Sequence, residues 1–123
     1  MKIFHCDILS FPLPEQQEFL ISKYELLTEA VVASGLCDRG QLRTAPQATL
    51  EQIAGVHDTG FVERLLAGEM SAEEIRDVGL PWSAEIVERA RRSAGATIET
   101  CRWALTEGPG ASEDWLYFLG SRY

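Results

Sequence analysis

Few side chains in this sequence could bind a metal or transfer a proton. Histidine occurs only at His5 and His57. His5, Cys6 and Asp7 are consecutive and offer three types of metal ligand, but neighbours in a strand point to opposite faces, so at most His5 and Asp7 could share an ion. We therefore interpret this tripeptide as a strand end with a buried Cys and a hydrogen-bonded His.

His57 and Asp58 precede a helical run, which favours a structural role for this pair. An Asp just before a helix accepts hydrogen bonds from unpaired amides, and its charge complements the helix dipole. A catalytic Cys–His pair is disfavoured because no cysteine lies in an exposed, electropositive segment. Cys101, for example, falls on a predicted apolar stripe.

Paired charges occur at residues 73–74 (Glu-Glu) and 91–92 (Arg-Arg). Adjacent helical residues diverge by about 100°, so we interpret both pairs as solvated surface charges. The chain lacks a glycine-rich phosphate loop, a GxSxG elbow and an HExxH sequence. The sequence therefore predicts no independent active site and no cofactor.

The first half of the sequence predicts a βαβ unit. Residues 2–6 favour a short buried strand, and residues 42–45 favour a second one that ends before Pro46. Between them, a helix is predicted from Glu15 to about Ser34, because apolar residues recur there with helical spacing. Gly35 ends this helix. If the two strands are parallel, the connection is right-handed.

Shorter helices and one long helix follow. Capping boxes predict helix starts at Thr49 and Ser71, and a helical run after Asp58 ends at Gly68. A helix over residues 83–106 carries a continuous apolar stripe that we expect to pack against a flat surface. The stripe consists of Ile86, Ala90, Ala94, Ile98, Cys101 and Leu105. Gly95, in the middle of this helix, predicts the close approach of another backbone.

Composition places the chain among globular proteins and argues against some classes of binding partner. The 123 residues are 46% hydrophobic and 24% charged, which fits one domain. A net charge of -8 argues against nucleic-acid binding, since that affinity depends on Lys and Arg. No apolar run is long enough to span a membrane, and three unpaired cysteines suit a reducing compartment. We expect a cytoplasmic protein.

Three segments together resemble the arginase-deacetylase fold, specifically histone-deacetylase-like bacterial proteins close to the class IV branch. Residues 11–15 (FPLPE) and 23–27 (KYELL) are similar to the family's Pro-Glu loop and the helix after it. Residues 54–65 (AGVHDTGFVERL) resemble its His-Asp-x-x-Tyr-Val stretch. Residues 79–97 resemble its Phe-Pro-Trp-Ser segment and Gly-Thr helix. Pro14 and Glu15 match a loop near the family's substrate entrance.

The resemblance implies a parallel α/β sheet whose full version hydrolyses acetyl-lysine or related acyl amides with one catalytic zinc. The family's adjacent His-His pair, its Asp-x-His ligand pair, its further ligand Asp and its transition-state Tyr have no counterpart in this sequence. The expected fold is therefore a truncated, helix-rich part of that sheet with a βαβ start. The expected function is a non-catalytic module with no catalytic or metal-binding residue, and zinc is expected only in the full-length family.

We expect deacetylase-like character over residues 1–107 and a divergent tail over residues 108–123, packed on the same domain or on a partner. A partial sheet has an open edge, so we expect a homo-oligomer, with a dimer as the simplest form, or binding to a complete deacetylase. The candidate interface in the tail is Trp115, Leu116, Tyr117, Phe118 and Leu119. The alternative is the N-terminal part of a split zinc-dependent deacetylase completed by a separate chain. A chance resemblance in an unrelated helical binding protein would place the N-terminus outside a parallel sheet.

Overall fold

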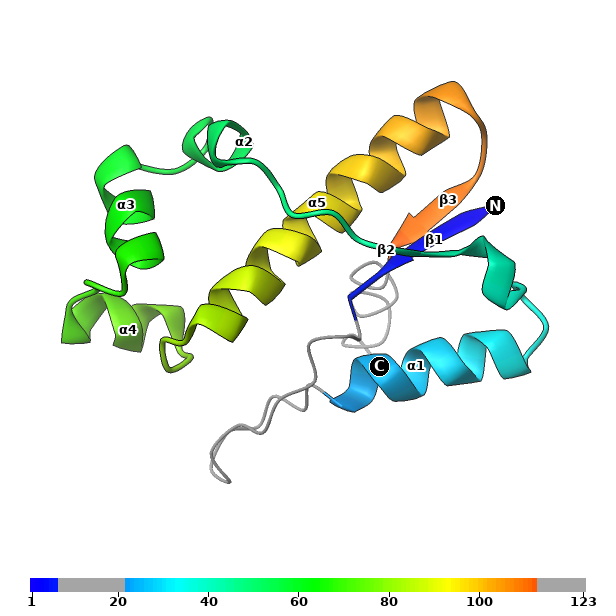
Figure 1. Cartoon of the computed structure of the whole chain (residues 1–123), viewed down its shortest axis with the longest axis horizontal. Helices are drawn as coiled ribbons and strands as arrows, with labels where there is room; N and C mark the ends of the chain where they lie inside the picture. Colours follow the sequence, from blue (N-terminus) through cyan, green and yellow to red (C-terminus); the bar gives the residue numbers. More distant parts are fainter. Residues whose placement is uncertain (7–21, 113–123) are drawn as a thin grey trace.

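A computed structural model of the chain describes residues 1–6 and 22–112 and shows a helix-rich, mixed α/β arrangement (Figure 1). In chain order the elements are β1 (Lys2–His5), α1 (Ser22–Ala33), the 3-10 turn η2 (Arg39–Gln41), β2 (Leu42–Thr44), α2 (Leu50–Ala54), α3 (Thr59–Ala67), α4 (Ala72–Val78), α5 (Ala84–Thr106) and β3 (Gly110–Ser112). The α/β class expected from the sequence is confirmed.

The sheet has the strand order β2-β1-β3, and both neighbours run parallel to β1. Ile3 pairs with Leu42 on one side and with Ala111 on the other. The predicted strands near residues 2–6 and 42–45 are therefore confirmed, and so is their parallel pairing through a helical crossover. The chain leaves β1 towards β2 and later returns past β1 to reach β3. In Figure 1 the strands lie between α1 and α5.

The strand β3 was not predicted. Residues 108–112 were expected only to begin the divergent tail, and glycine, proline, alanine and serine give them a low strand propensity. In the structure, the Lys2 amide donates to the Pro109 carbonyl at 3.3 Å, and this contact starts the pairing of β1 with β3. Pairing with a strand over a hundred residues away in sequence overrides local propensity here.

The helix after β1 was predicted from Glu15, and its described part is α1, which begins at Ser22. Residues 7–21 lie outside the described ranges. The helix ends at Ala33, close to the predicted end at Ser34. Tyr24, on its first turn, is buried.

The three short helices begin where their capping residues predict. The Thr49 hydroxyl accepts from the Gln52 amide, and the Ser71 hydroxyl accepts from the Glu74 amide, so both capping boxes form. Asp58 accepts from the Phe61 amide at 2.9 Å, which confirms its capping role. The helices α3 and α4 end at glycines with φ of 74° and 75°, a conformation that an L side chain rarely adopts.

The long helix α5 forms as predicted, but the face that packs on the sheet is a different one. The core joins Phe4 of β1, and Cys6 and Ala45 just after β1 and β2, to Ala96 on α5, with Trp103 packed against this cluster. Thr100 is also buried on this face. The apolar stripe from Ile86 to Leu105 was expected to pack against a flat surface, but the flat surface of this fold, the sheet, packs on another face of α5.

Gly95 lies under the segment that leaves β2. A β-carbon at this position would be 1.9 Å from the Pro46 carbonyl oxygen, so only glycine fits. The Ala48 amide donates to the Arg91 carbonyl at 2.8 Å, which fixes the same segment to the helix. The predicted close backbone approach is confirmed, and the neighbour is this extended segment. None of the described helices is long and apolar enough to cross a bilayer.

Candidate functional site

Several residues singled out from the sequence fall outside the described part of the chain. These are Asp7, the family entrance-loop match Pro14 and Glu15, and the tail residues Trp115, Leu116, Tyr117, Phe118 and Leu119. The expected change of character at Gly108 falls between α5 and β3.

His5 and Cys6 lie at the carboxyl end of β1 and point to opposite faces of the sheet, as their adjacency predicts. Cys6 is fully buried and joins the core beside α5, whereas His5 is half-buried. Within residues 1–6 and 22–112, no three His, Cys, Asp or Glu side chains come together as a metal site. Cys37 is buried and Cys101 is exposed, and both are free thiols.

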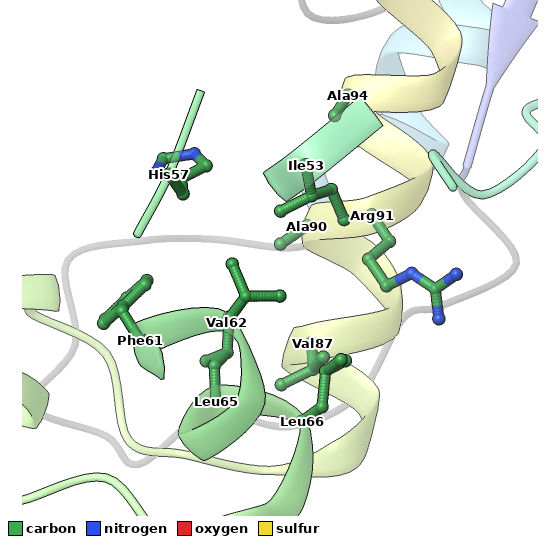
Figure 2. Close-up of a pocket in the computed structure, with 10 residues that line it drawn as sticks. All are labelled: Ile53, His57, Phe61, Val62, Leu65, Leu66, Val87, Ala90, Arg91 and Ala94. Carbon is green, nitrogen blue, oxygen red and sulfur yellow. The ribbon is translucent and has the colours of Figure 1, made fainter. Parts of the chain in front are cut away.

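An apolar hollow of about 140 Å³ lies between α2, α3 and α5 (Figure 2). Side chains from three helices line it: Ile53 from α2; Phe61, Val62, Leu65 and Leu66 from α3; Val87, Ala90, Arg91 and Ala94 from α5; and His57 at the start of α3. Phe61, Val62, Leu65 and Leu66 are the apolar residues of the helical run that was predicted after Asp58. The hollow is therefore suited to hydrophobic groups.

Two polar residues border the hollow, and neither forms an acid–base pair there. The Arg91 guanidinium turns away from it (Figure 2) and donates to the Ala48 carbonyl through Nε at 3.2 Å and Nη2 at 3.1 Å. Only the stem of Arg91 faces the apolar side chains. The exposed His57 ring lies 6.3 Å from the Phe61 ring, centroid to centroid. The surface of the hollow is thus mainly apolar.

The apolar surface continues along the outer face of α5. Ala94 lines the hollow, and Ile98, Cys101 and Leu105 follow it at spacings of four, three and four residues, which place them on one face. Cys101 is exposed, and the Leu105 side chain is 88% exposed. The predicted stripe therefore exists as a surface. Ala90 and Ala94 border the hollow, Ile98 is half-buried, and Cys101 and Leu105 are open to solvent.

Arg89 is a buried charged residue that lies off the predicted apolar stripe, and hydropathy alone did not single it out. It is buried, at 7% exposure, and donates through Nη1 to the Cys6 carbonyl at 3.0 Å. Its guanidinium carbon lies 3.9 Å above the Tyr24 ring. Arg89 thus joins α1, α5 and the carboxyl end of β1. Its spacing of seven residues from Ala96 could have placed it on the sheet-facing side.

The interpretation of Arg91 and Arg92 as solvated surface charges is also wrong. Both are partly buried, and Arg92 donates through Nη1 to the Ala45 carbonyl at 2.7 Å while pairing with Glu88 at 2.9 Å. The two arginines satisfy backbone carbonyls of the segment after β2, and so they hold this segment against α5.

Of the acidic pair on α4, Glu73 is exposed, as expected, whereas Glu74 has a structural role. Its carboxylate pairs with Arg64 of α3, and it also accepts from the Ser71 amide at 2.8 Å. The hydrogen bond from Arg64, together with those from Ser71, lowers the pKa of Glu74 from 4.5 to about 2. This carboxylate therefore stays ionised and joins α3 to α4.

Comparison with known proteins gives one informative similarity. The chain is 29% identical over 106 residues to an uncharacterized protein of the cyanobacterium Picosynechococcus sp.. The aligned part covers 86% of this chain and 35% of that protein, so the chain spans about a third of its relative's length. No protein-family model matches the chain.

Proposed function

We propose that this chain is a non-catalytic module related to histone deacetylases, with part of an arginase-deacetylase sheet, that acts by binding protein. The observation that carries the proposal is the open apolar face of α5, which extends from the hollow through Ile98 and Cys101 to Leu105. Contiguous exposed apolar surface of this kind is typical of protein interaction sites. A cytoplasmic location is part of the same proposal.

The arrangement of polar groups supports a binding role. The buried arginine Arg89 and the partly buried Arg91 and Arg92 all donate to backbone carbonyls of the strands or of the segment after β2. Asp58 caps a helix, and Glu74 joins two helices. These side chains hold elements together, and the surface they support is apolar.

The test combines a zinc measurement with an acetyl-lysine hydrolysis assay on the purified chain. We expect zinc well below one equivalent and no turnover above the rate without protein, with a complete zinc-dependent deacetylase as the positive control. Stoichiometric zinc together with turnover by the pure chain would overturn the non-catalytic proposal. Ile98→Asp and Leu105→Asp, which leave the sheet-facing side of α5 intact, then test whether binding of a protein partner uses this face.

The alternative is the N-terminal part of a split zinc-dependent deacetylase. The length of the cyanobacterial relative, of which the matched part is 35%, favours it. A second chain that carries the His-His and Asp-x-His sequences would then supply the zinc ligands. Zinc uptake and turnover by the mixed chains, with neither chain active alone, would establish this alternative. Mixtures that stay inactive and do not associate would exclude that second chain as the missing part.

A further inference from the structure

The two outer edges of the sheet differ in how their backbone groups are used. In a parallel strand, the N–H and C=O of one residue face the same side, and successive residues alternate. The Ala45 amide donates to the His5 carbonyl at 2.8 Å, so residues 43 and 45 face β1, and Leu42 and Thr44 face outwards. On the other side, the Pro109 carbonyl accepts from Lys2, so Ala111 faces β1 as well. The backbone groups of Gly110 and Ser112 therefore face outwards.

The outer edge of β2 is already blocked by this chain's own groups. The Leu42 amide donates to the Arg39 carbonyl, and the Leu42 carbonyl accepts from Arg43 Nη1 at 2.7 Å. Pro46 follows immediately. A charged side chain over the edge and a nearby proline are common ways to prevent pairing with another strand. Little of this edge is left for a partner.

The outer edge of β3 is less protected within the described residues. The strand consists of Gly-Ala-Ser, without a charge or a proline. Pro109 precedes it, but its carbonyl accepts from Lys2 and so faces β1. Among residues 1–6 and 22–112, no hydrogen bond reaches the outward N–H or C=O of Gly110 or Ser112. An unpaired row of this kind at a sheet edge is a template for a strand of another chain.

We propose that the outer edge of β3 is the site of self-association and that its occupant is β3 of a second copy of this chain. This inference rests on the proposed binding function, names a second copy of the chain as a partner, and adds the β3 edge as a second surface beside the apolar face of α5. If the two strands run antiparallel about a two-fold axis at Ala111, Gly110 of each copy lies opposite Ser112 of the other. Each such pair exchanges both hydrogen bonds, so all four outward groups of each copy are satisfied. The result is a continuous six-stranded sheet.

The position of α5 fits this arrangement. The helix packs over both β1 and β3. With strands about 4.8 Å apart, a two-fold axis beyond β3 would place the two α5 helices about 10 Å apart, which is the ordinary distance between packed helices. The uncharged edge also lets two copies, each with a net charge of -8, approach without opposed acidic side chains on the strands themselves.

Light scattering on the full chain over a wide concentration range tests the proposal, with two proline variants. Ser112→Pro removes one outward N–H and places a ring on the β3 edge, while the hydrogen bonds of Ala111 to β1 remain. Thr44→Pro makes the same change on the blocked β2 edge and is the matched control. We expect twice the monomer mass for the wild type and for Thr44→Pro, and the monomer mass for Ser112→Pro. The half-dissociation concentration of Ser112→Pro should rise at least about tenfold, equivalent to two lost hydrogen bonds.

A wild-type chain that stays monomeric, or a Ser112→Pro variant that still dimerises like Thr44→Pro, overturns the inference. Hydrogen exchange on the wild type gives the answer if a variant does not fold. The amides of Gly110 and Ser112 should be protected at high concentration and lose protection on dilution, whereas the Thr44 amide should exchange fast throughout. Fast exchange of all three amides contradicts the inference. Protection of Gly110 and Ser112 that does not change on dilution also contradicts it, because the β3 edge would then be paired within one chain. The zinc and turnover assay is independent of these outcomes, so failure of the β3 interface and failure of the non-catalytic proposal remain distinguishable.

Discussion

Gly95 is a position where the neighbouring backbone leaves no space for a side chain. Alanine at this position would bring a β-carbon to 1.9 Å from the Pro46 carbonyl oxygen and 2.9 Å from the Ala48 nitrogen, both backbone atoms that cannot rotate away. Alanine gains about 1 kcal/mol of helix propensity, but overpacking of this kind costs about 1–3 kcal/mol or more. We expect Gly95→Ala to lower the free energy of unfolding by about 1–2 kcal/mol in urea denaturation.

Gly40→Ala is the matched control for this change. Nothing lies within 4 Å of a β-carbon at Gly40, and its φ is not in the left-handed region. Its effect should stay within about 0.5 kcal/mol. Equal free energies of unfolding for the two variants would show that the segment after β2 does not pack closely against α5 at Gly95.

Glu74 makes a pH-dependent contribution to stability. Its pKa falls from 4.5 to about 2 on folding, chiefly because Arg64 donates to the carboxylate. A depressed pKa in the folded state adds stability above pH 4.5, and this contribution is lost as the pH falls towards 2. Glu74→Gln retains an acceptor for the Ser71 amide but loses the charge. We expect its melting temperature to lie slightly below that of the wild type at pH 7, with the difference shrinking between pH 4.5 and 2.

Glu73→Gln, at the exposed neighbouring residue, is the control for Glu74→Gln. Its difference in melting temperature from the wild type should not change comparably between pH 4.5 and 2. If the two variants have the same pH profile, the Arg64–Glu74 pair contributes nothing in solution.

At the scale of one element, α5 has two faces with different roles. Trp103 packs on the core, with the Lys2 ammonium 3.7 Å from its ring centroid and Gly110 close to its edge. Leu105 lies on the outer face and is 88% exposed. We expect Trp103→Ala to cost about 2–4 kcal/mol in unfolding free energy and Leu105→Ala less than about 0.5 kcal/mol. A large loss with Leu105→Ala would place the sheet on the apolar stripe instead.

The sequence predicted the elements of this fold better than their contacts. Both capping boxes and the Asp58 cap depend on residues three positions apart, so local patterns were sufficient to find them. Gly95 predicted a close backbone because glycine is otherwise costly inside a helix. The α3 face of the hollow followed from helical spacing. Each of these depends on a few neighbouring residues.

The misses all depend on contacts between distant segments. The strand β3 forms because β1 offers a free side, which its own three residues do not reveal. Hydropathy predicted that the apolar stripe of α5 packs against a flat surface, yet the sheet packs on the face with Arg89, Ala96 and Thr100. Arg89 is buried there because it can bond to the Cys6 carbonyl and stack on Tyr24. Burial of a charge depends on such partners, and the partners lie 83 and 65 residues away in sequence.

At the scale of the whole molecule, net charge and the two open surfaces act in opposite directions. A charge of -8 on 123 residues favours separation of two copies, whereas an unpaired strand edge and an exposed apolar face favour association. The described polar side chains mostly hold elements of one copy together. Association of two copies must therefore come from the uncharged surfaces, and it must overcome repulsion between the acidic ones.

This balance predicts the salt dependence of the dimer. The Debye length falls from about 30 Å at 0.01 M salt to about 8 Å at 0.15 M, so repulsion between two copies with a charge of -8 weakens while backbone hydrogen bonds at β3 are little affected. We expect the dissociation constant from sedimentation equilibrium to decrease several-fold over this range. The same trend should appear in Thr44→Pro, because its β3 edge is intact. Dimerisation that instead weakens with salt would mean that ion pairs between copies hold the dimer, which is incompatible with an interface at the uncharged edge of β3.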